Sequence, residues 1–255
     1  MHRSFFLLLL ATTAVPCFAA DNSWNGTWKL NTSKSQMTGT TTTFTQQGNM
    51  YHVATGPIAF AFACDGKEYP VFADRSMTCV QKGNAYTTRH LVAGKVLSTT
   101  VHTISADGKT ITETTTGTRP DGTSYTTTST SQREGNGQGL VGTWRETAVK
   151  LNAPSLLLVR IEGNKLHVED PNYKSTSETN LDGTPAALTG PTVAPGTMIS
   201  TTAEGPSKVL MTLSMNGKDM GKDEMTLSAD GKTLTDVSWT PGKENEKLTY
   251  TYDKQ

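Results

Sequence analysis

The sequence predicts an all-β protein made of two tandem antiparallel up-and-down β-barrels that follow a signal peptide. Threonine supplies 45 of the 255 residues, and its β-branched side chain favours extended backbone. Stretches with a helical period of apolar residues are scarce. The chain also repeats itself, because Gly26-Thr27-Trp28 recurs as Gly142-Thr143-Trp144, 116 residues later. Other short segments recur at offsets of 115 and 123 residues, so the sequence indicates a duplicated domain.

Residues 1–20 have the order of a secretory signal peptide. Arg3 precedes an apolar run, and small residues end the segment at Ala20. The apolar run is too short to span a membrane, so we expect cleavage near Ala20 and a mature protein that is periplasmic or secreted. Lipid attachment at Cys17 is the less favoured alternative, because Ala14-Val15-Pro16 stands where a leucine-rich motif is expected.

The rest of the chain is nearly neutral. Removing residues 1–20 takes away one arginine and leaves 22 basic against 23 acidic side chains. This balance gives no bulk attraction to nucleic acid or to an anionic membrane, so neither is an expected partner. No later apolar run is long enough for a transmembrane helix. An outer-membrane barrel is disfavoured too, because alternate strand positions are mostly Thr, Ser and Lys instead of large apolar residues.

Residues 21–134 form the first predicted repeat, with eight or nine short strands joined in sequence. Asp-Gly pairs separate several of them and predict type I′ hairpin turns, in which both central residues have positive φ. So long a meander must close into a barrel or fold over as a sandwich to bury its inner face and edges, and both closures remain open. The clearest predicted strands are residues 40–45, 50–53, 59–63, 86–92, 96–105, 110–118 and 124–131.

A glycine-rich linker at residues 135–139 separates the two repeats, and residues 140–255 form the second. Because each repeat has a full set of strands, we expect the two halves to fold independently. Prolines between residues 185 and 196 mark a long irregular loop that the first repeat lacks, either a lid or an insertion. Apolar alternation predicts these inward residues in the second repeat: Val209, Met211, Leu213, Met215, Met225, Leu227 and Leu234.

Each repeat resembles a bacterial lipocalin-like domain, because Gly-x-Trp on a first strand is the opening signature of that family. The resemblance covers residues 24–133 and 140–254, but the motif itself has only two fixed residues. It implies that the tryptophan packs at the closed end of a barrel, under a basic side chain that follows the last strand. The family's other short motifs and its helix after the last strand are not evident. The implied structural pairs are Trp28 with Arg133 and Trp144 with Lys254.

Two cysteines, Cys64 and Cys79, remain after the signal peptide. In an oxidising compartment they are most simply one disulfide, worth about 3 kcal/mol in the chain-entropy model. A metal site would need two further ligands nearby, and none has suitable spacing. His52 and His167 occupy equivalent positions in the two repeats, but their apolar neighbours have the opposite parity, so we expect both imidazoles to face solvent. No metal site is predicted.

A histidine and a carboxylate are predicted to meet inside the first barrel. If the hairpin at Asp107-Gly108 places Ile104 opposite Ile111, then His102 lies opposite Glu113 on the same inner face. Such a pair could orient a polar ligand group or act as acid and base. A bulge, or a position at the wet rim, would explain the pair equally well. The equivalent hairpin of the second repeat pairs Leu227 with Leu234 and Met225 with Asp236.

The expected function is non-catalytic binding of a small apolar or amphipathic molecule in a barrel cavity. No hydrolase, phosphate-loop or dinucleotide motif occurs, so no cofactor is expected. An envelope adaptor with solid-packed barrels and an enzyme that uses His102 and Glu113 are the alternatives, and a cavity of roughly 300 Å³ or more would favour the carrier. The candidate ligand-binding residues are Phe60, Phe62, Tyr69, His102, Glu113, Met225 and Asp236.

Overall fold

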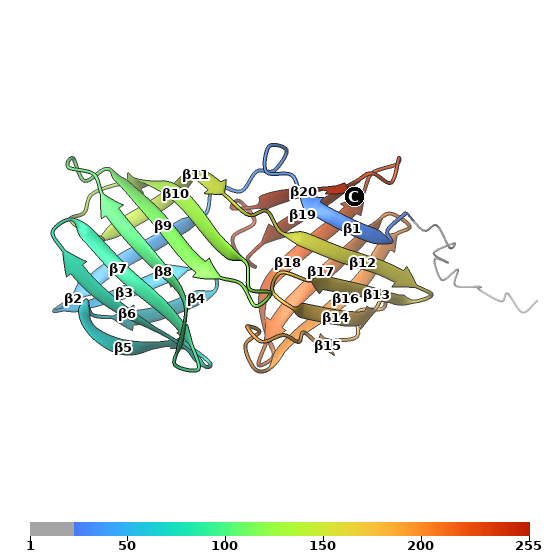
Figure 1. Ribbon diagram of the computed structural model, residues 1–255, viewed down its shortest axis with the longest axis horizontal. Helices are drawn as coiled ribbons and strands as arrows, with labels where there is room; N and C mark the ends of the chain where they lie inside the picture. Colours follow the sequence, from blue (N-terminus) through green and yellow to red (C-terminus); the bar gives the residue numbers. More distant parts are fainter. Residues whose placement is uncertain (1–22) are drawn as a thin grey trace, which may run out of the picture.

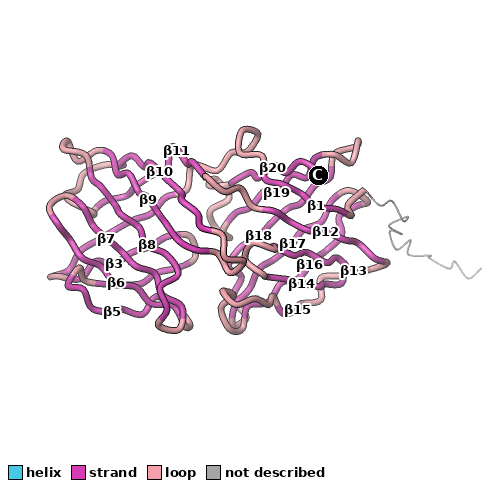
Figure 2. The backbone as a smooth tube through the Cα atoms, in the orientation of Figure 1, coloured by secondary structure: helices cyan, strands magenta, loops and turns pink. Residues whose placement is uncertain are grey.

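The computed structural model describes residues 23–255, so the predicted signal peptide and its cleavage site lie outside the described residues. The regular elements of this part of the chain are all β-strands joined by loops (Figure 2). They form two ten-stranded antiparallel sheets, each rolled into a nearly closed up-and-down barrel (Figure 1). The predicted fold class is therefore confirmed. Residues 23–255 contain no helix long and apolar enough to cross a membrane.

Barrel 1 has the spatial order β4-β3-β2-β11-β10-β9-β8-β7-β6-β5. Its strands are β2 (Thr41–Gln47), β3 (Met50–Thr55), β4 (Ile58–Phe62), β5 (Asp65–Phe72), β6 (Arg75–Lys82), β7 (Ala85–Val92), β8 (Lys95–Ile104), β9 (Thr110–Thr118), β10 (Ser124–Glu134) and β11 (Gly142–Leu151).

Barrel 2 has the spatial order β14-β13-β12-β1-β20-β19-β18-β17-β16-β15. Its strands are β1 (Gly26–Leu30), β12 (Leu156–Glu162), β13 (Lys165–Asp170), β14 (Ser175–Asn180), β15 (Ala186–Ala187), β16 (Thr197–Gly205), β17 (Lys208–Met215), β18 (Lys218–Leu227), β19 (Thr233–Trp239) and β20 (Leu248–Lys254).

The opening strand of each repeat lies in the barrel built mainly by the other repeat. β1 pairs with β12 and β20 in barrel 2, and Figure 1 shows this blue strand beside the red end of the chain. β11 pairs with β10 and β2 in barrel 1. Barrel 1 is therefore a continuous segment, residues 41–151, whereas barrel 2 combines residues 26–30 with 156–254. This division differs from the expected halves, 21–134 and 140–255, which placed each opening strand with its own repeat.

The segment after β1 explains how the chain crosses between the barrels. Asn31 donates its backbone N–H to the Thr251 carbonyl at 2.8 Å, and Gln36 and Thr249 exchange two backbone hydrogen bonds. The segment therefore runs along the edge of β20 before it reaches β2. At the start of β2, the Thr41 hydroxyl donates to the Glu246 carboxylate at 2.7 Å. These contacts hold the crossing against barrel 2 and make a tight β1–β2 hairpin unnecessary.

The exchange also changes which cation covers which tryptophan. Trp144 lies 4.0 Å from the Arg133 guanidinium and Trp28 lies 5.2 Å from the Lys254 ammonium, so the predicted cation–π contacts form with their partners exchanged. The Arg133 guanidinium also donates to the backbone carbonyls of Gly108, Gly139 and Val141. Each Trp side chain is almost fully buried. Both tryptophans are therefore packed in a barrel core beneath a basic side chain.

Each tryptophan also holds an apolar residue that stands four positions before it. The Trp144 indole N–H donates to the Leu140 carbonyl at 2.8 Å, and the Trp28 indole donates to the Trp24 carbonyl at 3.0 Å. Leu140 and Trp24 are buried in the cores of barrels 1 and 2. The closed end is thus formed by an apolar residue, a tryptophan and a cation. The spacing is visible in the sequence, since an apolar residue stands four positions before both tryptophans.

Barrel 1 has one seam, between its edge strands β4 and β5, where no ladder forms. The predicted disulfide forms beside this seam. Cys64 lies in the two-residue link between β4 and β5, directly before β5, and it is bonded to Cys79 in the middle of β6. The disulfide therefore fixes the link that crosses the seam to β6.

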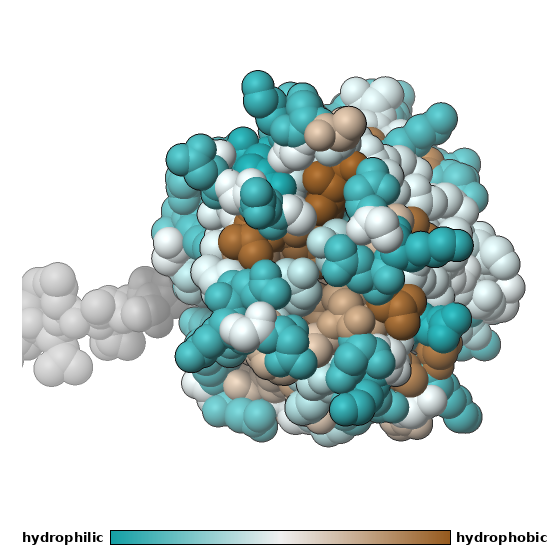
Figure 3. Space-filling model, turned by 90° about the vertical axis from the view of Figure 1, so that its left-hand side faces the viewer, coloured by the Kyte–Doolittle hydropathy of each residue, from teal (hydrophilic) through white to brown (hydrophobic). Residues whose placement is uncertain are grey.

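The outer surface is mostly hydrophilic. Figure 3 shows one end of the molecule, where hydrophilic side chains cover most of the surface and apolar areas are separate. In residues 23–255, the large apolar side chains that are exposed are Val80, Val96 and Val101. The apolar residues otherwise gather in two cores, one inside each barrel. The places that could hold a ligand are therefore the barrel interiors and the concavities of the surface.

Candidate functional site

Barrel 1 encloses a cavity of about 140 Å³. Strands β2, β3 and β4 line it with mainly apolar side chains, and strands β6 to β9 line it with Met77 and a set of polar side chains. In the order of the closed sheet, these two groups of strands lie on opposite sides of the barrel. The cavity is therefore amphipathic. Its lining residues are Thr42, Phe44, Val53, Thr55, Phe60, Phe62, Met77, Thr88, His90, His102, Glu113 and Leu140.

The β8–β9 hairpin positions the polar wall as predicted, with Ile104 opposite Ile111 and His102 opposite Glu113. The turn differs in detail from the expected type I′ form. Gly108 has a φ of +69°, but Asp107 is not among the residues with positive φ. The Asp107 carboxylate instead accepts hydrogen bonds from the Ser105 hydroxyl and from the Lys109 backbone. The turn is longer than the expected two residues, but it is extended equally on the β8 and β9 sides. The pairing of Ile104 with Ile111 is therefore the same as for the shorter turn.

A chain of hydrogen bonds runs across the polar wall. The His102 Nδ1 atom lies 2.5 Å from Glu113 Oε1, and its Nε2 atom lies 3.0 Å from the Thr88 hydroxyl. The Ser129 hydroxyl donates to the other Glu113 oxygen at 3.3 Å. The His102 and Glu113 side chains are 13% and 30% exposed, and both line the cavity. The pair therefore lies inside the barrel and forms part of the cavity wall.

The electrostatics of the wall favour an ionised Glu113. Burial by itself would raise the pKa of Glu113, but the hydrogen bond and charge of His102, with the Ser129 hydroxyl, outweigh it and hold the pKa below its usual value. The pKa of the neighbouring His90 is lowered as well, first by burial and then by repulsion from His102. A lower pKa favours the neutral form of an imidazole, so His90 and Glu113 have opposite preferences for the charged state. At neutral pH the wall thus presents a hydrogen-bond-accepting carboxylate and, at His90, a neutral imidazole.

The sequence prediction missed three polar residues of this region. His90 and Thr88 are inward positions of β7, in the same alternation as the buried Tyr86. Glu146 is an inward position of β11, two residues after Trp144, where burial and then repulsion from Glu113 raise its pKa to about 7. Parity within each strand would have shown that they face inward. Their approach to Glu113 depends on the closure of the sheet, and on β11 joining barrel 1.

The aromatic wall contains two of the predicted residues, and a third lies elsewhere. Phe60 and Phe62 stack with ring centroids 6.2 Å apart, and Tyr51 packs against Phe62 at 5.6 Å. Phe62 is only 2% exposed, so its ring belongs as much to the core as to the cavity. Tyr69 does not line the cavity. It packs against the edge of the core, and its hydroxyl donates to the Asp65 carboxylate at 3.1 Å.

The remaining predicted residues, Met225 and Asp236, lie opposite each other in barrel 2 and not beside His102 and Glu113. Met225 is fully buried in that core. Burial, followed by repulsion from Asp223, raises the pKa of Asp236 to about 8, and burial raises that of Asp223 to about 6. The Asp236 Oδ1 atom is inaccessible to solvent and has no hydrogen-bond partner among residues 23–255. The predicted set therefore divides between two separate interiors.

No group of three or more His, Cys, Asp or Glu side chains within residues 23–255 is arranged to hold a metal ion. His52 is exposed, as predicted, on the outer face of β3. His167 differs from the prediction because it is half-buried, with its Nε2 atom 3.9 Å from Glu169 and out of contact with solvent. The equivalent positions of these two histidines therefore do not bring them together.

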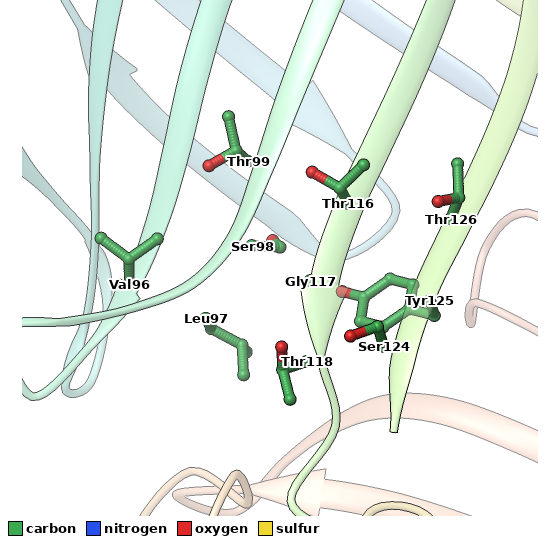
Figure 4. Close-up of a pocket in the computed structure, with 10 residues that line it drawn as sticks. All are labelled: Val96, Leu97, Ser98, Thr99, Thr116, Gly117, Thr118, Ser124, Tyr125 and Thr126. Atoms are coloured by element: carbon green, nitrogen blue, oxygen red, sulfur yellow. The ribbon is translucent and has the colours of Figure 1, made fainter. Parts of the chain in front are cut away.

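A second concavity of barrel 1, of about 500 Å³, is lined by the neighbouring ends of β8, β9 and β10. Figure 4 shows the Tyr125 ring beside Gly117, with Ser and Thr side chains around them. A side chain at Gly117 would meet this ring, because an added Cβ atom would lie 2.7 Å from Tyr125 Cε1. The groove contains no carboxylate or imidazole. The interior cavity, with its opposed apolar and titratable walls, is therefore the better candidate site.

No protein-family model matches this chain, and no curated protein matches it. The geometry of the site is therefore the basis of the functional assignment.

Proposed function

We propose that the protein is a non-catalytic binding protein that holds a small amphipathic molecule in the cavity of barrel 1. The observation that supports this proposal is the opposition of an aromatic wall to the hydrogen-bonded pair of His102 and Glu113 across about 140 Å³. Apolar cavities of about 150 Å³ bind benzene. The expected ligand is therefore one ring in size, with an O–H or N–H group that donates to the Glu113 carboxylate.

The small volume modifies the expected ligand. A cavity of roughly 300 Å³ or more would favour a carrier, and this cavity is about half as large, so the proposal is limited to a compact ligand and does not extend to a long lipid chain. We further propose that the barrels are lipocalin-like, on the basis of the Gly-x-Trp strand under a cation at each closed end. Ten strands in each barrel exceed the eight of lipocalins. The disulfide is consistent with the proposed location in the periplasm or outside the cell, where the environment is oxidising.

The proposal can be tested by isothermal titration calorimetry of the full chain with phenol and with benzene. We expect phenol to bind more tightly, because its hydroxyl can donate to the Glu113 carboxylate. Glu113→Gln should weaken phenol binding about tenfold or more, and leave benzene binding nearly unchanged. Phe60→Trp, which fills the cavity, should abolish both. Glu134→Gln is the matched control, because Glu134 is an exposed residue of the same barrel.

Two results would refute the binding proposal. One is that neither probe binds to the folded full chain. The other is that Phe60→Trp, while folded, binds both probes like the unchanged protein, which would place the probes outside the cavity.

Acid–base catalysis is the second candidate, because Thr88, His102 and Glu113 form the hydrogen-bonded order of nucleophile, base and orienting carboxylate. Acyl transfer also needs free N–H donors for the oxyanion. The backbone of Thr88 is paired in ladders on both sides, with Cys79 and with Thr100. This arrangement favours binding over turnover. Ester hydrolysis that disappears in folded His102→Ala protein would favour the enzyme instead.

A further inference from the structure

A second pocket, partly open to solvent, lies between the barrels and belongs to neither interior. Its volume is about 340 Å³, more than twice that of the barrel 1 cavity. Ile58 and Phe72 line it from barrel 1, and Leu188, Leu213, Met215 and Met220 line it from barrel 2. The two barrels face one another across this region in Figure 1. The pocket is within the size range of small-molecule sites, and it requires both barrels.

The wall of this pocket offers no free charge. Arg75 is the one ionisable residue among its lining residues. Its guanidinium lies 2.7 Å from the Asp74 carboxylate, and it also donates to the backbone carbonyl of Thr192. The charge of Arg75 is therefore compensated within the protein, and an anionic ligand group would have to displace Asp74. The lining favours an uncharged occupant.

The proline-rich loop of barrel 2 forms one side of the pocket. Residues 188–197 contribute Thr192, Val193 and Ala194 to the lining, and Ala194 is buried. Arg75 holds this loop through the Thr192 carbonyl, and the Thr197 hydroxyl donates to the Ala194 carbonyl at 2.7 Å. The sequence predicts this loop to be a lid or an insertion. In the structure it forms one wall of the pocket and is held to barrel 1 by Arg75.

We propose that this inter-barrel pocket is a second binding site, specific for a neutral apolar molecule larger than one ring. The apolar lining disfavours polar ligands. Anions are disfavoured because the charge of Arg75 is already neutralised by Asp74. Met215 and Met220 are flexible side chains that can adapt their shape to the ligand. The site is independent of the cavity in barrel 1, since the two spaces share no lining residue.

The test is fluorescence titration of the full chain with N-phenyl-1-naphthylamine, a neutral probe of more than one ring. We expect a saturable, blue-shifted signal with one probe per chain. Met220→Gln places an amide in the apolar wall and should weaken binding about tenfold or more. Met50→Gln is the matched control, because Met50 is half-buried at the start of β3 and lines neither space, and it should leave the affinity unchanged.

Phe60→Trp separates this proposal from the barrel 1 site. It should leave probe binding unchanged, because the probe is too large for the smaller cavity. Loss of probe binding in folded Phe60→Trp protein would place the probe in barrel 1 and overturn the inference. Absence of a saturable signal in the unchanged protein, or equal binding by Met220→Gln and Met50→Gln, would overturn it as well.

Discussion

Trp28 belongs to the first repeat but should stabilise barrel 2. Its side chain is 0% exposed, it lies on β1 between β12 and β20, and the Lys254 ammonium lies 5.2 Å from its ring. Truncation of a fully buried aromatic residue costs about 3–5 kcal/mol, and the lost cation–π contact adds about 0.5–2 kcal/mol. Trp28→Ala should therefore destabilise barrel 2 by about 3.5–7 kcal/mol and leave barrel 1 nearly unchanged.

Hydrogen exchange followed by mass spectrometry would locate the effect of this substitution. In Trp28→Ala, peptides from β12 and β20 should lose protection, while those from β2 and β10 keep it, because the latter strands flank Trp144. Trp144→Ala is the mirror control and should give the opposite distribution. If Trp28→Ala instead exposes β2 and β10, each opening strand lies in the barrel of its own repeat, and the strand exchange is refuted.

Three further predictions concern stability. Cys64–Cys79 closes a loop with a sequence separation of 15, and its reduction should destabilise barrel 1 by about 3 kcal/mol in urea titrations. Hydrogen exchange in β4 and β5 should rise. An unchanged urea midpoint would contradict the stabilising role of the disulfide. Burial, and then repulsion from Asp223, raises the pKa of Asp236 in the folded state, so its stabilising effect is complete below about pH 4 and is lost as pH rises through the folded pKa. Asp236→Asn should flatten this decline in denaturant titrations, and an identical decline would refute the assignment. Residues 38–153 contain every strand of barrel 1 and should unfold cooperatively as a separate fragment, whereas a non-cooperative transition would show that barrel 1 needs barrel 2.

Much of the local structure follows from sequence because strands alternate in a fixed way. The spacing of Ile104 and Ile111 about one turn is enough to place His102 opposite Glu113, and a second Asp-Gly turn does the same for Met225 and Asp236. The disulfide was predictable because only one pair of cysteines follows the predicted signal peptide. These features depend on neighbours in the sequence or on simple counting.

The exchange of opening strands could not be predicted in this way. Both strands begin with Gly-Thr-Trp, so either one supplies the same side chains to a barrel end, and the local pattern is the same for both connections. The contacts that decide the outcome, such as Gln36 with Thr249, join residues far apart in sequence. The size of the cavity and the proximity of Glu146 to Glu113 likewise depend on closure of the sheet.

The most direct test of the central claim, that barrel 1 holds a compact ligand, is native mass spectrometry of the protein purified from its natural source. We predict a non-covalent small molecule of constant mass, which denaturation releases and which is absent from Phe60→Trp purified in the same way. The Met220→Gln variant should retain it, because Met220 lies outside that cavity. A native mass equal to that of the polypeptide alone would contradict the account, and so would a single adduct that Phe60→Trp retains, because that molecule would lie outside barrel 1.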